Sequence, residues 1–275
     1  MKKIIIALDG AHFPKGAFEF AKEINNTTEI LLAGIFLSPV DYSKVLAFSG
    51  MEGISMMPEW LMRNEDDVLV NKNISLFEEA CIKEGILYRI HKETDLSALT
   101  SLVDETRFAD VLLVSGKLFY ENVQKEQPNF YLEEVLKKAE CPVMLIPEKY
   151  DSPKQVVLTY DGSESSVFAL KQFAYLFPQF TGYATKLISI NKTQIDEMTE
   201  YNMVTELVST HFQDLEILNL PMVDKKDFAT WMEEQPVSFI TIGAYSGNMF
   251  SSLFKKSFTA SVIHDLSMPI FISHI

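Results

Sequence analysis

The sequence predicts an α/β protein built from two doubly wound, parallel-sheet domains in tandem. Three observations support this fold class: motifs recur in the two halves, the apolar runs are short and rich in Ile, Val and Leu, and helical patterns separate them. Short runs that are apolar on both faces are typical of parallel strands buried between helices. Strands that alternate with helices imply right-handed crossovers and a sheet covered on both faces.

The internal repeat is visible at the first predicted strand of each half. Residues Lys2–Gly10 and Lys154–Gly162 are both apolar runs that end in Asp-Gly. An amphipathic segment follows each run, at Ala17–Ala21 and Ala169–Ala174. Each half therefore begins with a strand, a tight turn and a helix.

The repeat continues at the end of each half. One late apolar run ends at Gly116 and its counterpart ends at Gly243. Pro142 lies as far beyond Gly116 as Pro269 lies beyond Gly243, and each proline precedes another apolar run. Equal spacing of this kind indicates a tandem duplication.

We expect domains at residues 1–148 and 153–275, each with its own sheet of five parallel strands, and one continuous sheet would contradict this division. The last strands, Val143–Ile146 and Ile270–Ser273, are too apolar to remain open edges. They are expected to pair within the chain as a pseudo-dimer, while a homodimer of two chains stays open. The first half also carries a Met-rich insertion at about residues 40–70, predicted to be a hydrophobic flap or an adaptable surface.

The composition excludes several classes of function. The net charge is −14 and no run of Lys or Arg exceeds a pair, which disfavours binding to nucleic acid and to anionic membranes. The sequence shows neither a signal peptide nor an apolar stretch long enough to cross a bilayer, so a cytoplasmic location is expected. Cys81 and Cys141 belong to no metal or redox motif and are predicted to be reduced and structural. No metal site is predicted from the histidines.

Together these motifs resemble the universal stress protein family, twice over and along nearly the whole chain. The resemblance rests on the Asp-Gly after the first strand, the glycine after a late strand, and a Cys-Pro-Val or Met-Pro-Ile opening the last strand, at Cys141–Val143 and Met268–Ile270. It implies a Rossmann-like, adenine nucleotide alpha hydrolase-like fold and a role in stress response.

ATP-binding members of this family carry Gly-x2-Gly-x9-Gly-[Ser/Thr] after the fourth strand. Glycines allow the backbone to approach phosphate, and the following helix N-terminus offers unpaired N–H groups. In the second half the pattern falls on Gly243, Ser246, Lys256 and Ser257, with Gly247 beside Ser246. The first glycine and the final serine match, and Lys256 either supplies positive charge or belongs to a solvated helix start.

The turn after the first strand of the second half also resembles the family. Asp161-Gly162-Ser163 is close to its Asp-Gly-Ser turn. The resemblance implies that all three residues belong to the nucleotide site and that Asp161 contacts the adenosine end of a nucleotide. The serines at positions 163, 165 and 166 also fit the start of a helix, with Ser163 or Ser165 as the N-cap residue. Both interpretations are open from the sequence.

The first half departs from the nucleotide-binding pattern. There the pattern falls on Gly116, Phe119, Asn129 and Phe130, so only the first glycine is kept. An aromatic side chain at Phe119 would occlude phosphate, and Phe130 lacks a hydroxyl group. The sequence therefore predicts one nucleotide site per chain, in the second half.

The favoured function is a stress-response protein with a regulatory site for ATP or another adenine nucleotide in its C-terminal domain. The alternative is an interaction or scaffolding module that binds no nucleotide and acts through domain pairing. Slow ATP hydrolysis is a third hypothesis, for which the sequence offers no evident general base. No catalytic residue is assigned.

Overall fold

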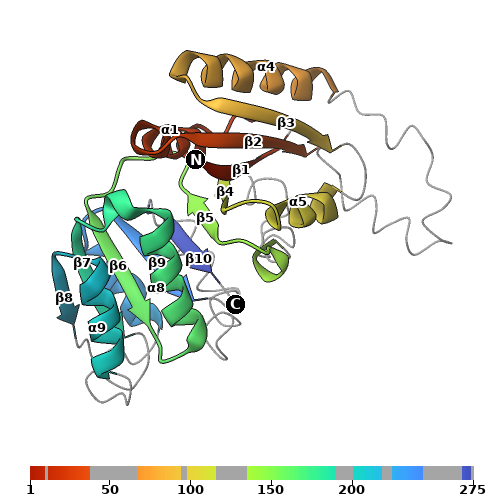
Figure 1. Ribbon diagram of the computed structural model, residues 1–275. Coiled ribbons are helices and arrows are strands. Elements are labelled where there is room, and N and C mark those ends of the chain that lie inside the picture. Colours follow the sequence, from red (N-terminus) through yellow and green to blue (C-terminus); the bar gives the residue numbers. More distant parts are fainter. Residues whose placement is uncertain are drawn as a thin grey trace, which may run out of the picture.

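The computed structural model describes residues 1–9, 12–37, 67–93, 98–115, 135–189, 201–218, 225–243 and 268–273. Its strands form two halves that lie side by side, as Figure 1 shows. The strands are β1 (Lys2–Asp9), β2 (Ile30–Leu37), β3 (Leu87–Glu93), β4 (Val111–Ser115), β5 (Val143–Ile146), β6 (Gln155–Tyr160), β7 (Ala184–Ser189), β8 (Leu215–Leu218), β9 (Ser238–Gly243) and β10 (Ile270–Ser273). The helices are α1 (Lys15–Thr27), α4 (Asp67–Glu84), α5 (Ala98–Thr106), α8 (Glu164–Leu176), α9 (Tyr201–His211), α10 (Lys225–Glu233) and the 3-10 helix η2 (Pro178–Phe180).

The strand order confirms that the two halves repeat one topology. It runs β3-β2-β1-β4-β5-β10-β9-β6-β7-β8. Strands β1 to β5, the N-terminal half, and strands β6 to β10, the C-terminal half, follow the same order from their outer edges inward. All pairs within each half are parallel. The fold class predicted from the sequence is therefore confirmed.

The last strands of the two halves pair with each other. β5 and β10 are antiparallel, with Met144 opposite Phe271 and Leu145 opposite Ile270. This is the pairing that the apolar character of both segments predicts. It satisfies the backbone groups of two strands that would otherwise be open edges.

The expectation of two separate sheets is wrong. The structure has one continuous 10-stranded sheet, because the β5–β10 ladder merges the two five-stranded halves. The two last strands cannot pair with each other and also belong to separate sheets. The structure shows the pairing, which covers both apolar edge strands. That residues 1–148 and 153–275 are independent domains stays a prediction.

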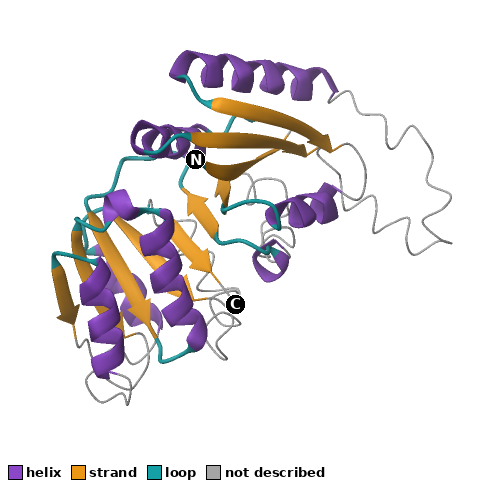
Figure 2. Ribbon diagram, in the orientation of Figure 1, coloured by secondary structure: helices purple, strands orange, loops and turns teal. Residues whose placement is uncertain are grey.

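Helices cover both faces of the sheet (Figure 2). Side chains of α1, α4, α8 and α9 pack on one face, in a cluster that includes Phe20, Phe77 and Phe173. Side chains of α5 and α10, such as Leu102 and Met232, pack on the other face. Both clusters contain residues from the two halves, so each face of the sheet has one shared core.

Aromatic contacts and two hydrogen bonds to Glu23 join the first helix to the second half and to the segment that connects the halves. Phe20 of α1 lies 5.6 Å from Phe177 and 6.0 Å from Phe239, measured between ring centroids. Glu23, one turn further along α1, accepts hydrogen bonds from Tyr150 Oη at 2.5 Å and Ser152 Oγ at 2.6 Å. The segment that connects the halves is therefore tied to the first helix.

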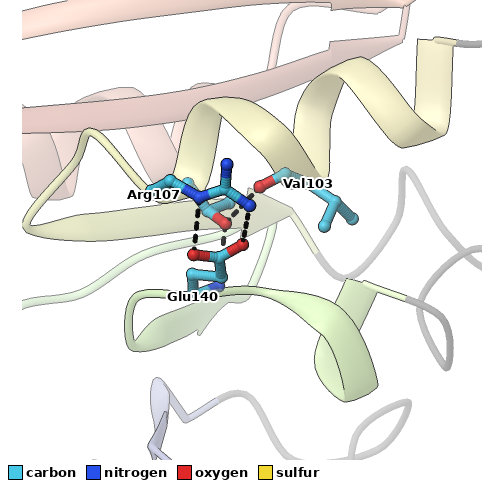
Figure 3. A network of polar contacts seen from close by, with 4 residues as sticks. Val103, Arg107 and Glu140 are labelled. Atoms are coloured by element: carbon cyan, nitrogen blue, oxygen red, sulfur yellow. Dashed lines mark hydrogen bonds and ion pairs between the residues drawn. The ribbon is translucent and has the colours of Figure 1, made fainter.

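An ion pair fixes the approach to β5, as Figure 3 shows. Arg107, just after α5, donates from Nε to Glu140 Oε2 at 2.8 Å and from Nη2 to Glu140 Oε1 at 2.5 Å. Thr106 Oγ1 accepts a hydrogen bond from the Glu140 backbone nitrogen at 2.8 Å and donates one to the Val103 carbonyl. The hydrogen-bonded guanidinium lowers the pKa of the Glu140 carboxyl. These contacts hold the chain in register as it enters β5.

Within the described part of the chain, no helix combines the length and the apolar character needed to cross a bilayer.

Candidate functional site

The candidate site lies at the carboxyl ends of β6 and β9. β6 has β7 on one side and β9 on the other, so the connections that leave β6 and enter β9 diverge at this point. Ligands of doubly wound sheets bind in the crevice at such a switch point. Asp161 follows β6 directly, and Gly243 is the last residue of β9.

The turn after β6 is built by Asp161, Gly162 and Ser163. Gly162 has a φ of 83°, a left-handed conformation that favours glycine. An Asp161 carboxylate oxygen accepts hydrogen bonds from the Ser163 backbone nitrogen at 3.0 Å and from Ser163 Oγ at 2.5 Å. The turn is therefore held by its own side chains.

Ser163 caps the helix that follows the turn. Its Oγ accepts a hydrogen bond from the Ser166 backbone nitrogen at 3.1 Å, and Ser166 Oγ donates to the Ser163 carbonyl at 2.8 Å. Glu164, in the first turn of α8, has the charge that a helix N-terminus favours. The N-cap interpretation of these serines is thus confirmed for Ser163. The ligand interpretation of Asp161 is not tested by these contacts.

Gly243 packs directly on the first turn of α8. A Cβ atom built on Gly243 would lie 2.3 Å from the backbone nitrogen of Ser166 and 2.5 Å from the carbonyl carbon of Ser165. Backbone atoms cannot yield to such an approach as a flexible side chain can, so this position requires glycine. Gly243 therefore lies against the start of α8, which directly follows the turn formed by Asp161, Gly162 and Ser163.

Two buried hydroxyl groups near Gly243 have no hydrogen-bond partner in the described structure. They are Thr241 Oγ1 on β9 and Ser273 Oγ on β10. Ser273 is the register partner of Gly243, and its side chain is buried. A buried hydroxyl without a partner costs about 1–3 kcal/mol, which a hydrogen bond to a ligand or a water molecule would offset. Neither residue can be predicted from the sequence, because a single Ser or Thr within an apolar run carries no spacing signal.

The equivalent region of the N-terminal half has different surroundings. A Cβ atom on Gly16, in the first turn of α1, would lie 1.9 Å from the Pro147 carbonyl oxygen. Ser115, at the end of β4, donates from its Oγ to a Glu148 carboxylate oxygen at 3.2 Å. The connecting segment therefore passes over this strand end and places a carboxylate beside it.

Several predicted residues lie outside the described residues. They are the remaining phosphate-loop candidates of the C-terminal half, their counterparts in the N-terminal half and most of the insertion: Ser246, Gly247, Lys256, Ser257, Gly116, Phe119, Asn129, Phe130 and residues 40–66. Among the described residues, no group of three His, Cys, Asp or Glu side chains is arranged to hold a metal ion. Cys81 and Cys141 are free and buried, in agreement with a structural role.

Comparison with solved structures identifies the fold. A universal stress protein from Archaeoglobus fulgidus DSM 4304 matches with a TM-score of 0.61 and 14% identity, covering 99% of this chain and 96% of that chain. A putative universal stress protein from Pseudomonas aeruginosa UCBPP-PA14 matches with a TM-score of 0.57 and 14% identity, covering 100% of this chain and 93% of that chain. No protein-family model and no curated protein matches the sequence.

The molecule is thus a tandem α/β protein with the universal stress protein fold along its whole length. A third match shows that this fold also occurs in another kind of protein. The cytoplasmic domain of a prokaryotic cation chloride cotransporter has a TM-score of 0.56 and 10% identity, covering 99% of this chain and 95% of that chain. The fold alone therefore does not establish a function, which must be argued from the site.

Proposed function

We propose that this chain is a stress-response protein of the universal stress protein family that binds an adenine nucleotide in its C-terminal half. One observation carries the location of the site. The N-terminus of α8, which follows the Asp161 turn, meets Gly243 at the switch point of the sheet. Beside them lies the Ser273 hydroxyl, which has no hydrogen-bond partner among the described residues. This is where a doubly wound sheet binds nucleotides.

The roles of the residues follow from their chemistry. Asp161 would accept hydrogen bonds from the adenosine end of the nucleotide. These would either replace the hydrogen bonds that it accepts from Ser163 or form in addition to them. Gly243, Ser246 and Gly247 would let the backbone approach the phosphates, while Lys256 and Ser257 would supply charge and a hydroxyl donor. The function is regulatory: nucleotide binding would change the surface that the C-terminal half offers to a partner. No catalytic step is proposed.

The N-terminal half is not proposed as a second site. Pro147 lies against the first turn of α1, and the Glu148 carboxylate accepts a hydrogen bond at the end of β4. A carboxylate beside a phosphate site adds like-charge repulsion. This contact supports the same asymmetry that Phe119 and Phe130 indicate in the sequence.

Calorimetric titration with ATP tests the proposal. Wild type is expected to bind one nucleotide per chain. Ser257→Ala removes a charge-assisted hydrogen bond of about 1.5–3 kcal/mol, so affinity falls roughly tenfold or more. The control is Gly116→Val, which leaves affinity unchanged. Two sites per chain, or a loss of binding only in Gly116→Val, would overturn the assignment. Mass spectrometry of small molecules released from freshly purified protein identifies any nucleotide already bound.

The second candidate is an interaction module without nucleotide. The observation that favours it is the β5–β10 ladder, which uses both apolar last strands inside one chain. The two halves are thereby joined in one sheet. Absence of binding in separate titrations with ATP, ADP and AMP selects this candidate.

A further inference from the structure

Helix α4 carries apolar side chains on two opposite faces. Its inner face packs on the core through Val70, Phe77 and Cys81. Its outer face exposes four large apolar side chains, with exposed fractions of 75% for Val68, 45% for Leu69, 41% for Leu76 and 68% for Ile82. In Figure 1, α4 is the outermost helix of the N-terminal half. A surface helix normally presents a polar face to solvent, so the outer face of α4 has the character of a contact surface.

The second half provides an internal comparison. α9 is the helix that precedes the outer strand of the C-terminal half, as α4 precedes that of the N-terminal half. Among its described residues, only Met203 is a large apolar side chain of high exposure. The apolar outer face is thus a property of α4 and not of the repeated fold.

The charges on the outer face of α4 are self-complementary. Lys72 and Glu79 are both exposed. They are two helical turns apart, so they lie on one face. They also lie equally far along the helix from the point midway between Ser75 and Leu76. Two such helices packed antiparallel around a two-fold axis at that point would place Lys72 opposite the partner's Glu79 twice.

We propose that the outer face of α4 docks with α4 of a second copy of this chain. A two-fold contact of this kind is closed, because the same patch is used on both copies. It leaves the β5–β10 ladder intact, since α4 lies over β2 and β3 at the far edge of the sheet. One 18-residue helix, about 27 Å long, contributes from each side. Such a contact is small, so we expect a concentration-dependent dimer.

Charge reversal tests the proposal. Sedimentation equilibrium of wild type is expected to give a mass that rises with concentration from the 31.3 kDa of one chain towards twice that value. Lys72→Glu and Glu79→Lys each replace two attractive pairs with two repulsive ones, so each variant weakens self-association by roughly tenfold or more. An equimolar mixture of the two variants restores both attractive pairs and is expected to dimerise as wild type does. The double variant Lys72→Glu/Glu79→Lys is expected to dimerise by itself.

The matched control is Lys154→Glu, which reverses an exposed lysine away from α4. It is expected to dimerise as wild type does. At a concentration at which wild type is monomeric, all variants are expected to keep the wild-type unfolding midpoint, because the changed side chains are exposed. A wild type that stays monomeric at every concentration overturns the proposal and leaves α4 to another partner. Single variants that dimerise normally, or a mixture that stays monomeric, overturn it as well.

Discussion

The ring of Phe20 lies 6.0 Å from the ring of Phe239, centroid to centroid, although the two residues belong to different halves of the repeat. Phe20 is fully buried and also contacts Phe177 at 5.6 Å and Phe180 at 6.3 Å. A helix of the first half thus completes the aromatic core of the second. The two halves are expected to unfold together, because neither can expose this cluster without a large loss of apolar burial.

Phe20→Ala is the direct test of the shared core. Truncation of a fully buried phenylalanine leaves a cavity and is expected to lower the free energy of unfolding by about 3–5 kcal/mol. Urea unfolding, followed by circular dichroism and by tryptophan fluorescence, is expected to show one coincident transition. The control is Phe108→Ala, since Phe108 is 67% exposed. Two separate transitions in wild type would show that the halves fold independently.

Gly243→Ala and Gly16→Ala test the two close backbone approaches. The added methyl group would meet the Ser166 nitrogen in the first case and the Pro147 carbonyl oxygen in the second. Each substitution is expected to destabilise the protein by about 1–3 kcal/mol, because a backbone segment must shift. Gly182→Ala is the matched control, since nothing lies within 4 Å of its added Cβ. Equal melting temperatures for all three variants would contradict the packing described for these glycines.

Ser163→Ala separates the capping role of this turn from a ligand-binding role. The substitution removes the acceptor for the Ser166 nitrogen and the hydroxyl that donates to Asp161. Loss of an N-cap is expected to cost about 0.5–2 kcal/mol of stability. The nucleotide affinity of the folded variant is expected to stay close to that of wild type. A large loss of affinity with unchanged stability would instead make Ser163 a ligand contact.

The two buried cysteines make the protein sensitive to alkaline pH. Burial raises the pKa of Cys81 and of Cys141 to about 12, from an ordinary value of 9.0. The folded state therefore holds these protons more tightly than the unfolded state. Their contribution to stability is complete below about pH 9 and is lost progressively as the pH rises towards 12.

Unfolding curves between pH 8 and pH 10.5 test this dependence. The free energy of unfolding is expected to fall with pH, and the fall is expected to be smaller in Cys141→Ala than in wild type. At pH 8 both thiols of the folded protein are expected to react slowly with a disulfide reagent and rapidly in urea. Rapid reaction without denaturant would contradict their burial.

The sequence alone predicts the repeated topology, because the strand ends and the edge strands of each half are marked by residues close together in the sequence. The Asp-Gly pairs at Asp9 and Asp161 mark the first strand ends, and the apolar runs at β5 and β10 reveal edges that need a partner. Their pairing follows from the cost of unpaired backbone groups, whereas the antiparallel direction of the pair is seen only in the structure. The same logic predicts a serine cap for α8 at Ser163 or Ser165, since N-caps depend on residues close in sequence.

Tertiary structure alone decided how the halves share their interior. Nothing near Phe20 in the sequence indicates that its ring packs with Phe239, and nothing near Pro147 indicates that its carbonyl lies on Gly16. The assembled fold also produces the continuous sheet and the Glu148 carboxylate at the end of β4. It likewise buries the Ser273 hydroxyl, for which the described part of the chain provides no hydrogen-bond partner. The physical reason is that local spacing governs strands, turns and caps. Packing, in contrast, depends on which surfaces meet once the strands have paired, and those surfaces come from segments more than a hundred residues apart in several of these contacts.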